Sequence, residues 1–267
     1  MPTFQGSTFS SYFKRILQIN QSTNTGADAT TRDVESGDGS KTSIKLSDDT
    51  LKVQPQNDNG ASFLVSNKAG TAIFDVNTGT AVVRVSGVNV MTQYANFAID
   101  STASASWSAD THYAIPFGLS ESIASFLALG SSTSSSFNDT NPATSTTITT
   151  TGYLDLNHFW YLQDDITIDK VEWFSGADAA TGDVLAAHLM KYDLVKDNSS
   201  TSGDLSNGTV MYDGSSVTNN GYEQIHYQDM DDQVTTASAG QVILFCVAAD
   251  TVNSDYAVRC YIKYHIT

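Results

Sequence analysis

The stretch that decides the fold runs from residue 43 to residue 90. It contains SIKLSDDTLKV at residues 43–53 and SFLVSNKAGTAIFDVNTGTAVVRVSGV at residues 62–88. Short runs of residues with high β propensity alternate there with turn clusters. Val and Ile pack well on a pleated surface, whereas Asn-Thr-Gly and Lys-Ala-Gly reverse the chain. The stretch therefore predicts a series of short strands joined by tight turns.

Strands this short cannot bury a face against their own neighbours, and a two-stranded unit of this size is marginal by itself. They become stable when several chains wind together and supply each other's core. We therefore expect residues 43–90 to form an intertwined trimeric β stalk. The alternative is a small monomeric β-meander.

The composition narrows the class of protein. The chain has 267 residues, 40% of them hydrophobic, with abundant Gly, Ser, Thr, Asn and Asp but only 4 Pro. This mixture fits many short strands joined by polar turns. No run of about 18 apolar residues is present, so no membrane insertion is expected. The first residues lack the basic-then-apolar layout of a secretory signal, so assembly in a cytoplasm is expected.

The net charge of −16 is placed unevenly along the chain. Residues 1–90 hold eight basic and eight acidic side chains, whereas residues 91–267 hold five and twenty-one. The acidic residues 91–267 cannot neutralise the phosphates of nucleic acid, and nucleic acid is therefore not expected as a partner. The charge suits a protein that must stay soluble at a high local copy number, the alternative being solubility alone.

The first 42 residues form the predicted anchoring segment. Residues 20–42 carry almost nothing apolar and are expected to be a loop or an extended arm laid along another surface. Before them, a helix of about twelve residues is too short to be stable alone. It is expected to dock on its own domain or, in the reading we favour, on a capsid or tail protein. This helix is predicted over residues 8–19, with an apolar face made by Phe9, Phe13, Ile16 and Leu17.

Residues 91–267 predict a C-terminal head domain, a β-sandwich of jelly-roll type. Met91–Ile99 is expected to open it, followed by a helical turn at 120–129 and a Ser/Thr-rich edge strand within 131–152. The run Ala239–Val247 is apolar enough for a central strand buried on both faces. Seven strand candidates follow from residue 153, separated by Gly, Asn and Asp: 153–162, 166–174, 183–192, 209–212, 222–227, 241–249 and 256–266.

No pattern for catalysis or metal binding stands out. The five histidines lack zinc-ligand spacing, and Gly118-Leu-Ser-Glu-Ser122 lacks the second glycine of a nucleophile elbow. We therefore expect no enzyme activity, no cofactor and no metal. Cys246 and Cys260 are expected to be buried free thiols, with pairing across a terminal hairpin as the alternative. Three acidic residues leave calcium open as an alternative: Asp229, Asp231 and Asp232.

A ligand site is expected where exposed aromatic rings lie beside polar loops. A ring covers the apolar face of a sugar, while amides and carboxylates take its hydroxyl groups. The loops within residues 212–232 offer such a mixture. The alternative is that these tyrosines pack in the sandwich or at the seam between copies. The candidate ligand-binding residues are Tyr212, Tyr222, Tyr227 and Asp229.

Three segments resemble structural fibre proteins of tailed bacteriophages, especially marine ones. They are FKRILQINQSTNTGADATTR at residues 13–32, LSDD at residues 46–49 and FLVSNKAGTAIFDVNT at residues 63–78. The likeness covers about residues 10–90 and is architectural beyond them.

The resemblance implies a homotrimeric fibre or spike on the virion surface. Its N-terminus would grip capsid or tail proteins, a β stalk would project, and a β-sandwich tip would adhere to a host receptor or glycan. One alternative is a capsid decoration protein that reinforces the shell without binding a receptor. Another, from a different class, is a spike enzyme that degrades glycans.

Overall fold

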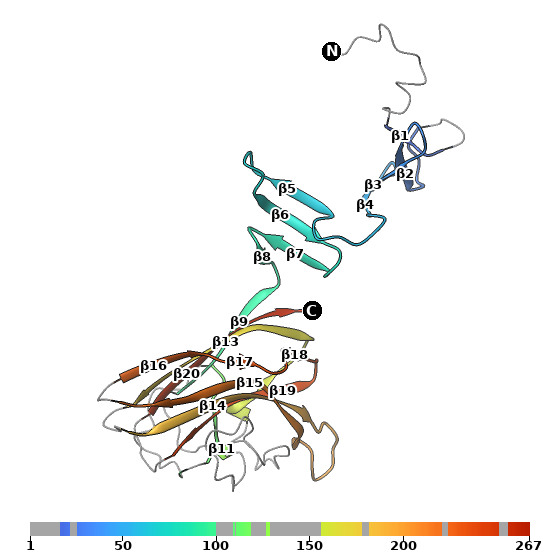
Figure 1. Ribbon diagram of the computed structural model, residues 1–267. Helices are drawn as coiled ribbons and strands as arrows, with labels where there is room; N and C mark the ends of the chain where they lie inside the picture. The colour runs from blue at the N-terminus through green and yellow to red at the C-terminus, as the bar shows by residue number, and fades with distance from the viewer. Residues whose placement is uncertain are drawn as a thin grey trace. The chain divides into compact units, whose positions relative to one another are not determined.

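The described part of the chain consists of β-strands and one 3-10 turn, Leu156–His158, so the predicted all-β class is confirmed (Figure 1). It divides into two units, Met1–Val90 and Met91–Thr267. No helix of the described part has the length and apolar character needed to span a membrane. The computed structural model describes residues 17–21, 26–99, 109, 111–118, 127–128, 156–177, 182–220, 224–250 and 256–267.

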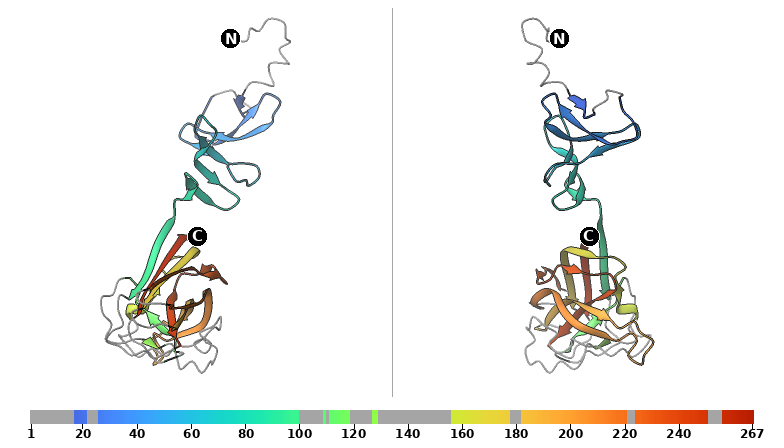
Figure 2. Two further views of the ribbon diagram at one scale, coloured as in Figure 1. Left: turned by 60° about the vertical axis from the view of Figure 1, so that its left-hand side comes forward. Right: turned by 90° about the vertical axis from the view of Figure 1, so that its right-hand side faces the viewer.

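The first unit contains two small antiparallel sheets, coloured blue to green in Figure 2. The first has the order β1-β2-β3-β4, with strands Leu17–Ile19, Arg32–Ser36, Lys41–Leu46 and Leu51–Val53. The second has the order β5-β6-β7-β8, with strands Phe63–Ser66, Ala72–Asn77, Val82–Val85 and Val88–Asn89.

Strand register gives the first small sheet one polar and one apolar face, because successive side chains point to opposite sides. On the polar face, the carboxylate of Asp33 lies 2.8 Å from Lys41 Nζ and 3.1 Å from Lys45 Nζ. The apolar face is made by Leu17, Ile19, Val34, Ile44, Leu46, Leu51 and Val53.

The second small sheet is sorted in the same way. On its polar face, Arg84 Nη1 lies 3.6 Å from Asp75 Oδ1, across neighbouring strands. Its apolar face is made by Phe63, Val65, Phe74, Val76, Val83, Val85 and Val88. Each small sheet therefore has an apolar face that needs a cover.

The turn between β5 and β6 follows the predicted chemistry. The side-chain Oδ1 of Asn67 accepts the backbone N–H groups of Ala69 and Thr71 at 2.9 and 3.0 Å. Gly70 then takes a φ of +86°, a conformation that strains residues with a Cβ atom. The Asn-Lys-Ala-Gly sequence thus fixes the hairpin by side-chain hydrogen bonding and glycine freedom together.

Two expectations for the N-terminal segment are wrong where the structure describes it. The end of the predicted helix, Leu17–Ile19, is strand β1 and pairs with β2. The expected loop over residues 20–42 contains β2 and the start of β3. This segment contains few apolar residues because one face of its strands is polar. On that face Asp33 forms ion pairs with Lys41 and Lys45. Three of the four proposed anchor residues lie outside the described residues: Phe9, Phe13 and Ile16.

The second unit contains two larger antiparallel sheets. One holds β9 (Thr92–Ile99), β13 (Ile166–Ala177), β16 (Gln224–Asp229), β18 (Thr236–Ala237) and β20 (Tyr256–Ile266). The other holds β10 (Tyr113–Ile115), β11 (Leu127–Ala128), β12 (Trp160–Tyr161), β14 (Val184–Leu194), β15 (Leu205–Thr218), β17 (Asp231–Asp232) and β19 (Gln241–Ala249).

The main strands of this unit pair in a nested order. Strand β9 pairs with β20, β10 with β19, β13 with β16 and β14 with β15. This is the pairing of one long antiparallel ribbon folded across itself. Successive pairs of the ribbon alternate between the two sheets, which have the orders β16-β13-β20-β9 and β10-β19-β14-β15 within their longer paths.

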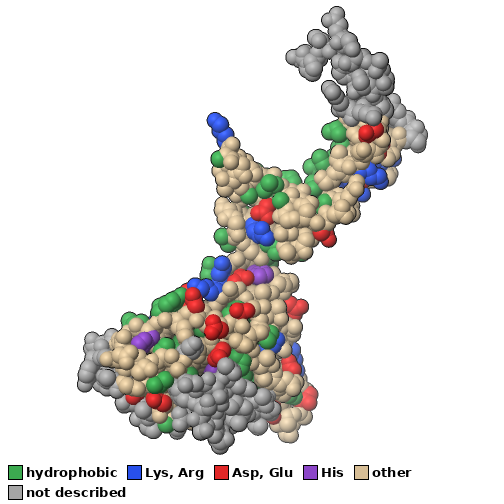
Figure 3. Space-filling model, in the orientation of Figure 1, with side chains coloured by type: hydrophobic (Ala, Val, Ile, Leu, Met, Phe, Trp, Pro, Cys, Tyr) green, Lys and Arg blue, Asp and Glu red, His purple; other side chains and the backbone are tan. Residues whose placement is uncertain are grey.

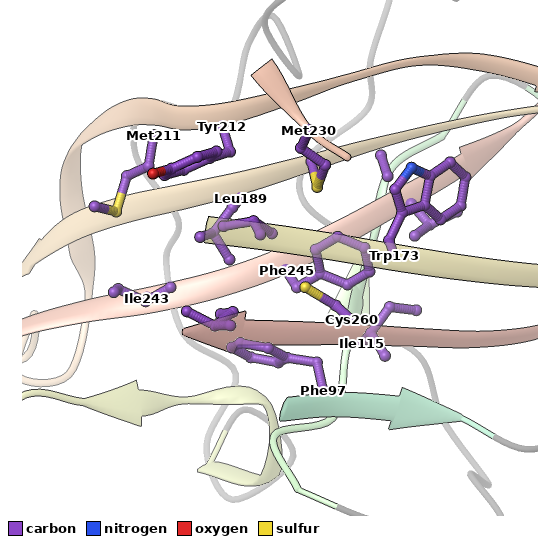
Figure 4. Close-up of a cluster of buried hydrophobic side chains, with 14 of the residues drawn as sticks. Phe97, Ile115, Trp173, Leu189, Met211, Tyr212, Met230, Ile243, Phe245 and Cys260 are labelled. Atoms are coloured by element: carbon purple, nitrogen blue, oxygen red, sulfur yellow. The ribbon is translucent and has the colours of Figure 1, made fainter. Parts of the chain in front are cut away.

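One hydrophobic core takes side chains from both sheets (Figure 4). The ring of Phe245 on β19 lies 6.1 Å from that of Phe97 on β9 and 6.5 Å from that of Trp173 on β13. A second cluster that includes Leu244 lies on the opposite face of β19. The prediction that Ala239–Val247 forms a central strand buried on both faces is therefore confirmed over the strand.

Two predicted strands are confirmed with their bounds, and two other predicted elements differ from the structure. The strands at 241–249 and 256–266 are confirmed with the same bounds. The candidate at 153–162 is wrong in its described part, which holds the 3-10 turn and the short β12. The expected helical turn at 120–129 is wrong at Leu127–Ala128, which is β11, and residues 131–152 lie outside the described part.

Strand β15 runs through two glycine pairs that were predicted to be turns, Asn207-Gly208 and Asp213-Gly214. Gly214 is instead required by close packing, since an added Cβ would lie 3.1 Å from the backbone oxygen of Ala187 and 3.2 Å from Trp173 Nε1. The register against β14 shifts at three places, one of which accommodates Asn207-Gly208 as a bulge, whereas Asp213 and Gly214 pair regularly with His188 and Ala187.

A buried histidine pair makes the second unit sensitive to acid. His112 and His188 are buried with ring centroids 5.0 Å apart, and His188 Nδ1 lies 2.9 Å from Asp213 Oδ1. Burial, with the neighbouring His188, lowers the pKa of His112 from 6.5 to about 3. The unfolded chain binds this proton near pH 6.5 and the folded chain does not, so stability is complete above pH 6.5 and falls as the pH drops.

We expect the free energy of unfolding to fall by about 2 kcal/mol between pH 7 and pH 5 through this histidine alone. The substitution His112→Asn removes the titrating group and is expected to flatten the dependence by that amount. Denaturant titrations of both proteins at the two pH values measure the difference. Equal slopes in the wild type and the variant would contradict the assignment.

Candidate functional site

The most exposed apolar surface of the first unit is formed by the apolar faces of its two small sheets. Leu17 is 64% and Leu51 68% exposed on the first sheet, and Val88 is 51% exposed on the second. Val34 is the one large hydrophobic residue of the described part of this unit that is fully buried. Folded proteins rarely leave large contiguous apolar area in water, so these faces are a candidate interaction surface.

In the second unit, an aromatic row crosses the side of the β9-β20-β13-β16 sheet that points away from the core, called the outer face below. The ring of Phe174 lies 5.1 Å from that of Tyr227 and 5.8 Å from that of Tyr261. These rings come from β13, β16 and β20, whose register brings alternate residues to the same side. Figure 3 shows hydrophobic, basic and acidic side chains interspersed along the part of the surface where β13 and β16 lie.

A polar cluster continues this row. Lys170 Nζ lies 2.5 Å from Glu172 Oε1 and 3.1 Å from Asp229 Oδ1. The hydroxyl of Tyr227 lies 2.7 Å from the same Glu172 oxygen and 2.9 Å from the same Asp229 oxygen, so its single proton is shared between these two acceptors. One amine, one hydroxyl and two carboxylates therefore satisfy each other.

The pKa shifts of the cluster follow from these contacts. The hydrogen bonds to Glu172 and then Asp229 raise the pKa of Lys170, and they raise the pKa of Tyr227 to about 12. The Lys170 ammonium holds the pKa of Glu172 below its usual range, and Tyr227 followed by Lys170 does so for Asp229. Lys170 and both carboxylates are thus charged and Tyr227 is protonated at neutral pH.

The predicted ligand-binding residues fall into three groups. Tyr227 and Asp229 meet on the outer face, as described above. Tyr212 lies in the core instead, because β15 points it inward, where its hydroxyl donates to the backbone oxygen of Ile168 at 3.0 Å. For Tyr212 the alternative of packing in the core is the observed one. Tyr222 lies outside the described residues.

Of the predicted anchor residues, only Leu17 is described. It lies on the apolar face of the first small sheet.

Sequence reasoning missed the partners of Tyr227 on neighbouring strands. Lys170, Glu172 and Phe174 alternate with the core residues Val171 and Trp173 along β13. This period of two is visible in the sequence and separates an inner from an outer set. It does not say which strand lies beside β13, and that pairing brings Tyr227 and Asp229 to them.

The remaining site hypotheses concern metals and thiols. No group of three His, Cys, Asp or Glu side chains in the described part is arranged to hold a metal ion. The calcium alternative gains no support, since Asp229 is engaged by Lys170 and Tyr227, and Asp231 and Asp232 form β17. The two cysteines, Cys246 and Cys260, are buried free thiols, as predicted, and they lie on strands of different sheets.

The two surfaces differ in chemistry. The faces of the first unit are dominated by apolar side chains, and Arg32 and Ser36 lie on one of them as well. The outer face of the second unit carries aromatic rings beside one ammonium group and two carboxylates. No protein-family model, no curated protein and no solved structure matches this chain.

Proposed function

We propose that the chain is the subunit of a homotrimeric virion fibre or spike that displays an adhesive head domain on the virion surface. The observation that carries the proposal is the pair of small sheets whose apolar faces remain exposed in a single copy. The other copies of the same chain are the proposed cover. The trimeric state and the location on the virion are inferred from the resemblance of residues 13–78 to phage fibre proteins.

Identical chains are suitable partners for these faces. The apolar side chains are Leu, Ile and Val on the first face and Phe and Val on the second, and they can interdigitate with their equals around a symmetry axis. Covering the exposed half of one such side chain contributes about 1 kcal/mol. Residues 1–90 carry no net charge, so close approach of several copies meets no net repulsion.

The head domain is proposed to be a jelly roll. In that architecture a long antiparallel ribbon is rolled into two facing sheets, so that the first strand pairs with the last and the fourth with the fifth. The nested pairing from β9–β20 to β14–β15 supports this assignment. Jelly rolls occur in viral proteins and in lectins, which is consistent with an adhesive role.

The acidic charge of the head supports a surface location. Residues 91–267 carry five basic and twenty-one acidic side chains, so the heads repel one another outside the stalk. This keeps neighbouring heads soluble and separate at the high local concentration of a virion surface.

The anchor is assigned to residues 1–16, which include Phe9, Phe13 and Ile16 and precede the first strand. We expect a variant that lacks residues 1–16 to remain a soluble trimer and to be lost from particles, because β1 and both small sheets stay intact. Immunoblots of purified particles measure incorporation, and sedimentation of the free protein measures the assembly state.

Full-length protein expressed at the same level is the control for this experiment. Normal incorporation of the truncated chain would place the anchor elsewhere. A reconstruction of the particle then separates the two structural roles. A fibre occupies a few symmetry-related positions, whereas a decoration protein occupies the whole lattice.

A further inference from the structure

A groove of about 320 Å³ lies in the second unit and uses none of the residues of the outer face. Its volume falls at the lower end of the range of roughly 300 to 1,000 Å³ found for small-molecule sites. Three of its lining residues come from separate elements, with Phe117 after β10, Trp160 on β12 and Tyr264 on β20. Tyr161, Gln163 and Asp164 complete the part that the argument uses.

The aromatic rings of the groove form an ordered wall. Phe117 and Trp160 are stacked, with centroids 5.7 Å apart and planes inclined by 6°. The ring of Tyr264 meets that of Trp160 edge to face at 4.9 Å. Tyr161 is 44% exposed, and Lys196 Nζ lies 5.3 Å from its ring centroid. Lys196 therefore lies over one face of the Tyr161 ring, and the remaining ring surface of Tyr161 is exposed.

Backbone pairing holds these side chains in place before any ligand arrives. Trp160 and Tyr161 pair with β19. The N–H of Phe117 donates to the backbone oxygen of Asn157 at 2.8 Å, and the N–H of Leu162 donates to that of Gln241 at 3.0 Å. Folding has thus already ordered this backbone, so binding of a ligand would require little further loss of conformational entropy there.

The polar groups of the groove differ from those of the outer face in one respect that matters for binding. Lys170, Glu172 and Asp229 on the outer face are engaged with each other and with Tyr227. Within the described part of the chain, the exposed side chains of Gln163 and Asp164 have no hydrogen-bond or ion-pair partner. Their amide and carboxylate groups are therefore free to bind hydroxyl groups of a ligand.

We propose that this groove is a binding site for a neutral sugar ring. The aromatic rings would cover the apolar side of the sugar, the Gln163 amide would donate hydrogen bonds to its hydroxyl groups and accept from them, and the Asp164 carboxylate would accept from them. An acidic sugar is disfavoured because the carboxylate of Asp164 lies in the groove and the whole unit is strongly acidic. The inference rests on the proposed adhesive function of the head and locates it.

The full-length protein is titrated by calorimetry with D-glucose, D-galactose, D-mannose and N-acetyl-D-glucosamine, and with N-acetylneuraminic acid as the acidic probe. We expect at least one neutral sugar to bind and the acidic sugar to bind more weakly. Tyr161→Ala is expected to weaken binding at least tenfold, because it removes exposed ring surface. Asp164→Asn is expected to weaken it as well and alters no buried group.

Tyr227→Ala on the outer face is the matched control, since this tyrosine is 52% exposed and outside the groove. It is expected to leave sugar binding unchanged. Absence of binding by the wild type, stronger binding of the acidic sugar, or a loss caused by Tyr227→Ala alone would each overturn the assignment. Sedimentation of the same samples shows whether the trimer is present, so failure of this site is distinguished from failure of the proposed fibre.

Discussion

We expect the double substitution Val65→Glu and Val88→Glu to change the sedimenting species from a trimer to a monomer. Both side chains lie on the apolar face of the second small sheet, where Val88 is 51% exposed in a single copy. In the trimer they would be buried against the other copies. Burying an unpaired carboxylate costs several kcal/mol, and three copies bring six of them together.

The fold of a single chain tolerates these changes, since both side chains are exposed in it. The matched control is Ile225→Glu, which places the same charge on a residue that is 75% exposed in the second unit. Sedimentation velocity compares the three proteins. If the double variant and Ile225→Glu both remain trimers, the apolar face of the second small sheet is not the interface.

The second large effect is expected in the core of the head domain. Phe245→Ala is expected to lower the free energy of unfolding by about 3 to 5 kcal/mol, because it leaves a cavity between the two sheets. The residue is fully buried, and its ring lies near those of Phe97 and Trp173. All three tryptophans of the chain lie in residues 91–267, so tryptophan fluorescence during denaturant unfolding reports on this unit.

Ile225→Ala is the control for this experiment, because the side chain is exposed and its removal is expected to change stability by no more than about 0.5 kcal/mol. A loss below about 1 kcal/mol for Phe245→Ala would mean that the two sheets do not share this core.

The strands that the sequence predicted best are those whose environment is uniform. Strand β19 is buried on both faces and therefore reads as one apolar run, and β20 alternates between buried and exposed residues from Tyr256 to Ile262. Strand β15 was harder, because Gly214 looks like a turn residue. A glycine is required at position 214 because Trp173 and Ala187 pack closely against it, and both residues lie far away in the sequence. Such packing has no local signal.

The same limit applies to the N-terminal segment. Leu17 fits the helical spacing of Phe9, Phe13 and Ile16, and with Ile19 it also fits the alternation of a strand, so periodicity cannot separate the two over so few residues. Leu17–Ile19 forms a strand because it pairs with β2. The exposed apolar faces, in contrast, follow from alternation along each short strand, which the sequence contains.

The candidate binding residues show how far local patterns reach. Tyr227 and Asp229 were predicted as part of loops that mix aromatic and polar residues, whereas both lie on strand β16, where their spacing of two places them on the same face. Tyr212 was misplaced because the direction of its side chain depends on the bulges of β15. The groove could not be predicted, since Phe117, Trp160 and Tyr264 meet only after β12 and β20 take their places in the fold.

The central claim is that copies of this chain cover each other's apolar faces through the first unit. Sedimentation equilibrium of the unmodified full-length protein tests it most directly. The chain has a mass of 28.6 kDa, and the account predicts a species of three times that mass that persists on dilution to micromolar concentration. A folded species of 28.6 kDa at that concentration would contradict it.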